Sequence, residues 1–249
     1  MSLEGKVVLV TGASRGIGAA TVLELASHGA RVVAGARNVE QLEKLRRQGE
    51  GASGEIAVTA MDVRREPDVK AAIALARERF GGLDALVNNA AVGALGRIET
   101  QDAEEWRSVL ETNVVGTLLC CREAIPLLAE RAGTIVNISS AAAADGFPYL
   151  AAYSASKAAI AALSMALRRE LREQKIRVST LRIHYVASEF LSAMPAERVG
   201  EATEVWRREG LLAAVPLMQP ARVAETIRFL IELPPEASVH DVDLRASGA

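Results

Sequence analysis

The chain has 249 residues, of which 50 % are hydrophobic, 24 % charged and only 4 % aromatic, and its net charge is −2 at pH 7. This length is usual for one α/β domain, and an aliphatic-rich, aromatic-poor composition suits parallel strands covered by helices on both faces. The near-neutral charge provides no field that would attract nucleic acid or a membrane surface, so we expect neither as a partner.

The two cysteines, Cys120 and Cys121, are adjacent in an apolar stretch. A bond between neighbours would be strained, so we expect both to be buried as small hydrophobic side chains. The N-terminus lacks a charged region followed by a long apolar run, and no stretch approaches the apolar length of a membrane span. A cytoplasmic protein without a metal site is the simplest interpretation.

Apolar runs that end in turn residues predict strands at 6–10, 31–34, 55–59, 84–87, 134–138, 176–181 and 239–244. Helical periodicity predicts helices at 17–27, 40–48, 67–80, 103–128 with a bend near Gly116, 151–173 and 221–233. This alternation indicates an α/β fold, a doubly wound parallel sheet (Rossmann fold) of seven strands. We expect a single domain over residues 1–249, with its ligand at the carboxyl ends of the strands.

A glycine-rich turn joins the first expected strand to the first expected helix. Gly12 permits a tight turn, Gly16 lets the backbone approach a pyrophosphate, and Gly18 lets the helix pack on the strand. The free N–H groups of a helix start bind phosphate, so the turn indicates a dinucleotide site rather than a purely structural glycine turn. The predicted contacts are Gly12, Ser14, Arg15, Gly16, Ile17 and Gly18.

The spacing Gly-x-x-x-Gly-x-Gly resembles that of the short-chain dehydrogenase/reductase family, and the resemblance runs from the first expected strand to the last. It implies that Asp62 and Val63, after the third strand, edge the adenine ring of a cofactor. It also implies that Asn89 and Ala90, after the fourth strand, line the adenosine ribose.

The end of the second strand carries no carboxylate, because Gly35 and Ala36 precede Arg37. An NAD site usually has Asp or Glu there to hold the ribose hydroxyls. Arg15 precedes a helix N-terminus, where the helix dipole disfavours positive charge, and a nearby dianion would remove that conflict. Because Arg is also the natural bidentate partner of phosphate, Arg15 and Arg37 indicate the 2′-phosphate of NADP(H). The alternative is two ordinary surface arginines.

Tyr153 and Lys157 lie four residues apart at the start of a predicted helix, so they share one face. A nearby ammonium favours the phenolate and lowers the tyrosine pKa from about 10, which suits proton exchange with a carbonyl oxygen. Tyr153 and Lys157 alone would also fit an amphipathic surface pair. Their occurrence together with Ser140 and Asn113 indicates catalysis.

The family resemblance implies three further roles. Ser140, at the end of the fifth strand, hydrogen-bonds the substrate oxygen; Ser139 is the alternative, but adjacent strand residues face opposite sides. Asn113 perturbs its helix and holds a water in a proton relay that reaches Lys157. Lys157 also binds the nicotinamide ribose, and Tyr153 lies against the cofactor.

Ile183 and His184 stand where the family usually has Pro-Gly, whose backbone approaches the nicotinamide carboxamide. Either His184 turns outward, or it lines the substrate pocket, or it weakens cofactor binding. The C-terminal stretch 237–245 resembles a subgroup of NADPH-dependent reductases that includes clavulanate-type aldehyde reductases and serine-type hydroxy-acid dehydrogenases.

These features predict an oxidoreductase that transfers hydride between NADP(H) and a small-molecule carbonyl/alcohol pair, most simply by reducing an aldehyde or ketone. We expect residues 187–216 to form a lid over the substrate. By the family resemblance, the two long helices form a homodimer or homotetramer. One alternative is an NADP-binding sensor or scaffold with little turnover, for which positions 183–184 are the best support. Another is an enoyl reductase, in which Tyr and Lys lie farther apart.

Overall fold

The computed structural model describes residues 2–212 and 217–247, so the end of the expected lid, 213–216, lies outside the described residues. The strands form one seven-stranded parallel sheet in the order β3-β2-β1-β4-β5-β6-β7. They are β1 Val7–Thr11, β2 Arg31–Ala36, β3 Glu55–Ala60, β4 Ala85–Asn88, β5 Thr134–Ser140, β6 Arg177–Ile183 and β7 Asp241–Leu244. This doubly wound sheet confirms the predicted Rossmann fold.

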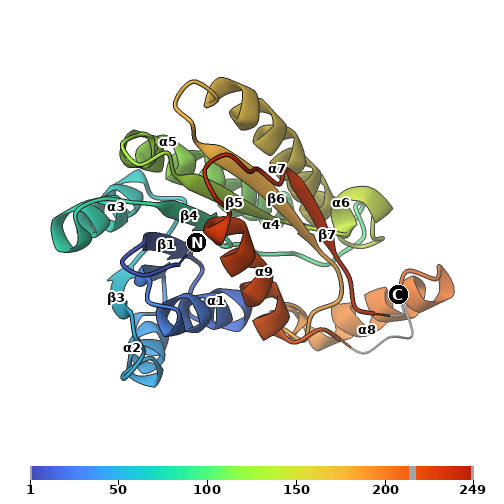
Figure 1. Ribbon diagram of the computed structural model, residues 1–249. Coiled ribbons are helices and arrows are strands. Elements are labelled where there is room, and N and C mark those ends of the chain that lie inside the picture. The colour runs from blue at the N-terminus through green and yellow to red at the C-terminus, as the bar shows by residue number, and fades with distance from the viewer. Residues whose placement is uncertain (1, 213–216, 248–249) are drawn as a thin grey trace.

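Helices cover both faces of the sheet (Figure 1). They are α1 Gly16–Ser27, α2 Val39–Gln48, α3 Glu66–Phe80, α4 Ala103–Leu110, α5 Gly116–Ala129, α6 Ala142–Asp145, α7 Ala151–Glu170, α8 Ala196–Arg208 and α9 Pro220–Glu232. Side chains of β1 alternate between the faces: Val8 and Val10 pack in the layer with α1, α2 and α9, whereas Val7 and Leu9 pack with α3, α5 and α7. Both faces are therefore buried, as the continuous apolar strands predict.

The helix expected over 103–128 is interrupted by a π-helical turn, η1 Glu111–Val115, between α4 and α5. The expected bend near Gly116 therefore comes from η1. Such single π turns are frequent at functional sites, and this one contains Asn113.

The whole run Ala103–Ala129 is long and apolar enough to cross a membrane by length and composition, contrary to the expectation that no stretch approaches this size. Within the fold, 44 % of its most apolar window is buried, and the core helix of a soluble protein passes the same test. Cys120 and Cys121 belong to the buried side, and burial raises the pKa of the Cys121 thiol to about 12. Both cysteines thus act as small core side chains, as predicted.

The strand order reverses between β1 and β4, because the chain leaves β1 toward β2 and β3 and returns to form β4 on the other side. In sheets of this kind, ligands bind at the carboxyl ends of the strands, at the point where the strand order reverses. The residues considered next lie at this edge of the sheet.

Candidate active site

The glycine-rich turn packs directly on the end of β4. Gly12 has a φ of +64°, and a Cβ atom there would lie 2.8 Å from the Ala90 Cα atom. A Cβ atom on Gly18 would collide with the Gly12 carbonyl oxygen. The Asn89 amide donates to the carbonyl oxygens of Thr11 and Gly12 at 2.9 and 3.2 Å. Asn89 therefore holds the turn in shape, a role beyond the expected lining of a ribose.

The start of α1 presents backbone N–H groups to this turn. Arg15 is its N-cap residue, with φ −160° and ψ 173°, and no side chain of the described residues caps it there. Gly16 has a φ of +55°, and a Cβ atom there would meet nothing closer than the Ser188 Cβ atom at 3.9 Å. An uncapped helix start with open space before it binds anions, so the turn fits the pyrophosphate of a dinucleotide.

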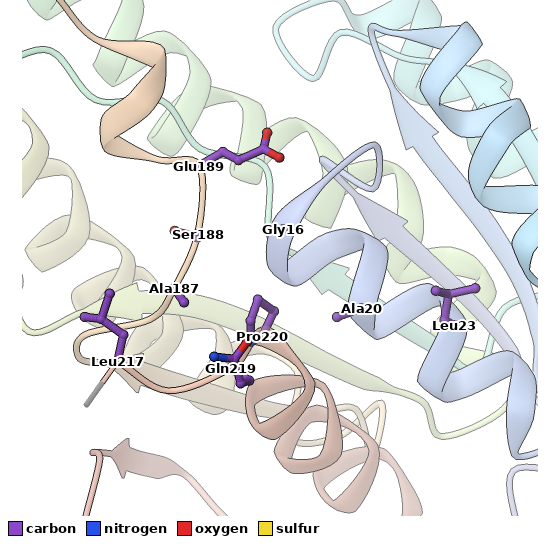
Figure 2. A pocket seen from close by; sticks show the side chains of 9 residues that line it. All are labelled: Gly16, Ala20, Leu23, Ala187, Ser188, Glu189, Leu217, Gln219 and Pro220. Atoms are coloured by element: carbon purple, nitrogen blue, oxygen red, sulfur yellow. The ribbon is translucent and has the colours of Figure 1, made fainter. Parts of the chain in front are cut away.

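A cleft of about 620 Å³ adjoins the phosphate turn (Figure 2). Gly16 lines it from α1, and Ser188 and Glu189 line it from the segment that follows β6. Arg15 Nη1 lies 3.4 Å from Glu189 Oε2, and both side chains are more than half exposed. The expected lid thus begins beside the phosphate turn.

Charged side chains also gather where β2 and β3 end. Arg64 Nη2 lies 2.5 Å from Asp62 Oδ2. The hydrogen bond from Arg64 is the main cause that holds the pKa of Asp62 below its usual value, and the charge of Arg37 adds to it. Val63 is buried and packs on Gly116, where a Cβ atom would lie 2.6 Å from Val63 Cγ2. The structure therefore brings Asp62 and Arg37 together, while the Val63 side chain belongs mainly to the core.

At the carboxyl end of β5, Ser140 reaches Tyr153. The Ser140 side chain lies close enough to Tyr153 to act on its pKa, which it lowers. Ser139 faces the other way: it is buried, and its hydroxyl donates to the Lys157 carbonyl oxygen at 3.0 Å. The alternation of strand residues thus gives Ser140, and not Ser139, a side chain that can contact a ligand of Tyr153.

Lys157 lies one turn after Tyr153 on α7, with its Nζ atom 5.7 Å from the centre of the Tyr153 ring. Nζ donates to the Ile138 carbonyl oxygen at 2.9 Å, and burial lowers the pKa of Lys157 to about 8. Burial also raises the pKa of Tyr153 to about 12, although its hydrogen bond with Ser140 acts in the opposite direction. Desolvation of the phenolate is therefore the larger of the two effects on the Tyr153 pKa here.

Asn113 ties the π turn to the loop after β4 and to α7. Its Oδ1 atom accepts from the Val92 N–H, and its Nδ2 atom donates to the Val92 carbonyl and to Ser156 Oγ, all at 2.9 Å. Ser156 in turn donates to the Tyr153 carbonyl oxygen at 2.6 Å. Asn113 is thus linked through Ser156 to the backbone of Tyr153, while its role in a proton relay stays a prediction.

The family model described as short chain dehydrogenase matches residues 6–198. The chain belongs to the short-chain dehydrogenase family. It is 33 % identical over 234 residues to the 3-oxoacyl-(acyl-carrier-protein) reductase of Thermotoga maritima, which covers 92 % of each chain. It is also 33 % identical over 252 residues to the farnesol dehydrogenase of Aedes aegypti, covering 98 % of this chain and 97 % of that protein.

Among solved structures, the alcohol dehydrogenase of the archaeon Thermococcus sibiricus, complexed with 5-hydroxy-NADP, superposes with a TM-score of 0.84 at 28 % identity and covers 97 % of both chains. These similarities make the chain a hydride-transferring oxidoreductase that acts on CH–OH or C=O groups of small molecules.

His184, the main departure from the family pattern, turns toward β7. Its Nε2 atom lies 2.6 Å from Asp243 Oδ1, its side chain is 8 % exposed, and its backbone N–H donates to the Leu244 carbonyl oxygen at 3.2 Å. Since β7 and β5 flank β6 on opposite sides, the side chain points away from Ser140. Of the three alternatives, this contact favours a His184 side chain turned away from the site, where it is bonded to Asp243.

Several site residues were not anticipated from the sequence as parts of the site. They are Arg64 beside Asp62, Ser156 beside Asn113, Ser188 and Glu189 opposite the phosphate turn, and Gly93, which the lid covers. Only Arg64 carried a sequence signal, since an Arg two residues after an acidic residue at a strand end can fold back on it. The others depend on contacts between distant segments. Among the described residues, no group of three or more His, Cys, Asp or Glu side chains could hold a metal ion.

Proposed function

We propose that this short-chain dehydrogenase uses NADP(H) and reduces an aldehyde or ketone to an alcohol. The observation that carries the reaction type is that Ser140 and Tyr153 lie side by side, next to Lys157, at the carboxyl ends of the strands. Two hydroxyl groups that meet at one point can both bind one carbonyl oxygen.

The cofactor assignment is supported by the uncapped start of α1 and by the charges around it. The turn from Gly12 to Gly18 would hold the pyrophosphate, and Arg15 and Arg37 would hold the 2′-phosphate, because no carboxylate ends β2. Asp62 would edge the adenine. When bound, the cofactor supplies or accepts the hydride.

In the reductive direction, Tyr153 donates its proton to the carbonyl oxygen as a C–H bond forms at the carbonyl carbon and the C=O π bond breaks. Ser140 donates a hydrogen bond to the same oxygen and polarises the carbonyl before transfer. A protonated Lys157 stabilises the Tyr153 phenolate that remains, which then takes a proton back from solvent. Asn113 holds the π turn and α7 in register for these steps.

A titration with NADPH and NADH, followed by cofactor fluorescence, tests the cofactor. We expect NADPH to bind at least about 10-fold tighter, or about 1.4 kcal/mol. Equal affinities would refute the proposed phosphate contacts of Arg15 and Arg37.

Tyr153→Phe tests the reaction, with Tyr149→Phe as the matched control. We expect Tyr153→Phe to keep NADPH binding and lose aldehyde reduction, whereas Tyr149→Phe keeps both. Binding without turnover in the unaltered protein, over a panel of aldehydes and ketones, would favour the sensor or scaffold role instead.

We also propose that residues 1–249 form one domain, that the protein is cytoplasmic, and that it assembles as a homodimer or homotetramer through α4–α5 and α7. The support for assembly is that these helices expose large apolar side chains. They are Leu110, Val115, Leu118 and Met165. Light scattering of Leu118→Asp should show a smaller particle than the unaltered protein, and an unchanged mass would exclude this interface.

A further inference from the structure

An aromatic side chain from the lid lies directly on Tyr153. The ring centres of Phe190 and Tyr153 are 4.9 Å apart, with 46° between their planes. Phe190 precedes the short helix η2 Leu191–Ala193, in the segment that links β6 to α8. A substrate carbonyl that reaches the Tyr153 hydroxyl therefore places its neighbouring group against the Phe190 ring.

Gly93, in the loop after β4, leaves room for Phe190 and Met194 to pack closely. A Cβ atom on Gly93 would lie 2.5 Å from Phe190 Cζ and 2.7 Å from Met194 Cε. Gly93 has an ordinary φ, so the lack of a side chain there serves close approach and not a special backbone shape. Phe190 and Met194 fill the space that a larger residue would take.

The position of Phe190 is fixed because both ends of its segment are anchored. Before it, Val186 pairs with Met218 in a parallel bridge, and the Ala187 N–H donates to the Met218 carbonyl at 2.8 Å. After it, α8 is held by Trp206, whose Nε1 atom donates to the Pro148 carbonyl at 2.7 Å. A segment tied at both ends cannot move Phe190 far without breaking these bonds.

The side chains packed around Tyr153 are mainly apolar. Tyr153 and Met194 pack against one cluster that includes Leu150, Phe147 and Trp206. Such a wall gives no hydrogen bond to a polar substituent next to the reacting carbonyl, and burying one there would be costly.

Given the reductase function proposed above, we propose that Phe190 is the residue that sets substrate specificity. Together with Met194 and Gly93 it forms a slot that accepts a flat or unbranched apolar group beside the carbonyl, as in aromatic or straight-chain aldehydes and ketones. Branching at the carbon next to the carbonyl drives the substituent into the Phe190 ring.

The first test compares NADPH-dependent reduction of benzaldehyde and of 2,2-dimethylpropanal by the unaltered protein, Phe190→Ala, Gly93→Ala and Phe229→Ala. Phe229 is exposed on α9, so it is a matched control of the same substitution. We expect Phe190→Ala to raise kcat/KM for the branched aldehyde relative to benzaldehyde by about 10-fold, the scale on which apolar pockets discriminate. Gly93→Ala should also change this ratio, because its methyl group displaces the ring, and Phe229→Ala should not. An unchanged ratio in Phe190→Ala would overturn the assignment.

The second test needs no turnover, so it separates failure of this inference from failure of the proposed function. Nitration of Tyr153 by tetranitromethane, mapped by mass spectrometry, reports whether Phe190 covers the ring. We expect several-fold faster nitration of Tyr153 in Phe190→Ala and no change in Phe229→Ala. Equal rates would show that Phe190 does not cover Tyr153 in solution and would overturn the assignment.

Failure of the unaltered protein to reduce any carbonyl would refute the reductase function, and with it a specificity role for Phe190, whatever the nitration rates.

Discussion

Glu189 of the lid forms an ion pair with Arg15 of the phosphate turn, at 3.4 Å. The carboxylate thus binds the guanidinium that the proposed function assigns to the 2′-phosphate of NADP(H). The Arg15 guanidinium cannot bind the Glu189 carboxylate and the 2′-phosphate equally well at once, so Glu189 should compete with the cofactor for Arg15.

We therefore expect Glu189→Gln, which keeps the shape and removes the charge, to tighten NADPH binding by about 2- to 5-fold, the range of an exposed ion pair. The gain should shrink in high salt, because salt screens exposed charges. Isothermal titration at two salt concentrations measures both effects. Glu197→Gln, a second exposed lid carboxylate, is the control and should leave the affinity unchanged. Weaker binding of NADPH to Glu189→Gln would show that Glu189 supports the cofactor and does not compete with it.

Substitution of His184 should leave the affinity for NADPH unchanged. Because its side chain is bonded to Asp243 on the far side of β6 from Ser140, His184→Ala should leave the Kd for NADPH unchanged. It should lower the free energy of unfolding by about 1 kcal/mol, since one partly buried hydrogen bond is lost. Asp243→Ala also removes the ion pair with Arg245, so it should cost at least as much, and the double variant should cost less than the sum. A large rise in the Kd for NADPH would place the His184 side chain in the cofactor site after all.

The sequence was sufficient to predict what depends on local pattern. Strand–helix alternation predicted the sheet, and residue alternation along β5 predicted that Ser139 and Ser140 face opposite sides, as the Ser139 contact with Lys157 shows. The glycine spacing predicted a turn whose close packing the structure shows at Gly12 and Gly18.

Features that depend on contacts between segments distant in the sequence could not be predicted in this way. The Phe190 ring lies on Tyr153, and the His184 ring is covered by Asp243, through contacts that no spacing along the chain indicates. The pKa of Tyr153 shows the same limit: a neighbouring Lys can be read from the sequence, but the burial that raises the pKa cannot.

Asn113 should matter for stability as well as activity. Its amide is buried and makes three hydrogen bonds, to both backbone groups of Val92 and to Ser156. Asn113→Ala removes all three bonds and leaves their partners without replacement, so we expect a loss of about 3 kcal/mol in the free energy of unfolding, measured in urea, and a large loss of kcat. Asn38→Ala, which removes only the exposed cap of α2, is the matched control and should cost about 1 kcal/mol with kcat unchanged. Equal losses in the two variants would remove Asn113 from the support of the site.

The lowered pKa of Lys157 should make the free energy of unfolding depend on pH. The folded-state pKa of about 8 lies below the usual value of 10.5, so between these pH values the unfolded chain binds more protons than the folded one, and stability rises with pH. At pH 7 the buried ammonium should cost about 3 kcal/mol, and at pH 9.5 only about 1 kcal/mol. Lys157→Met removes this titration, so its free energy of unfolding relative to the unaltered protein should fall by about 2 kcal/mol between pH 7 and pH 9.5, while reduction is abolished at both pH values.

Because all other titrating groups are shared by the two proteins, their contributions cancel in the difference. Lys44→Met, exposed on α2, should show no such change. A difference that stays constant with pH would mean that Lys157 keeps an ordinary pKa, and its charge would then be available to Tyr153 well above pH 8.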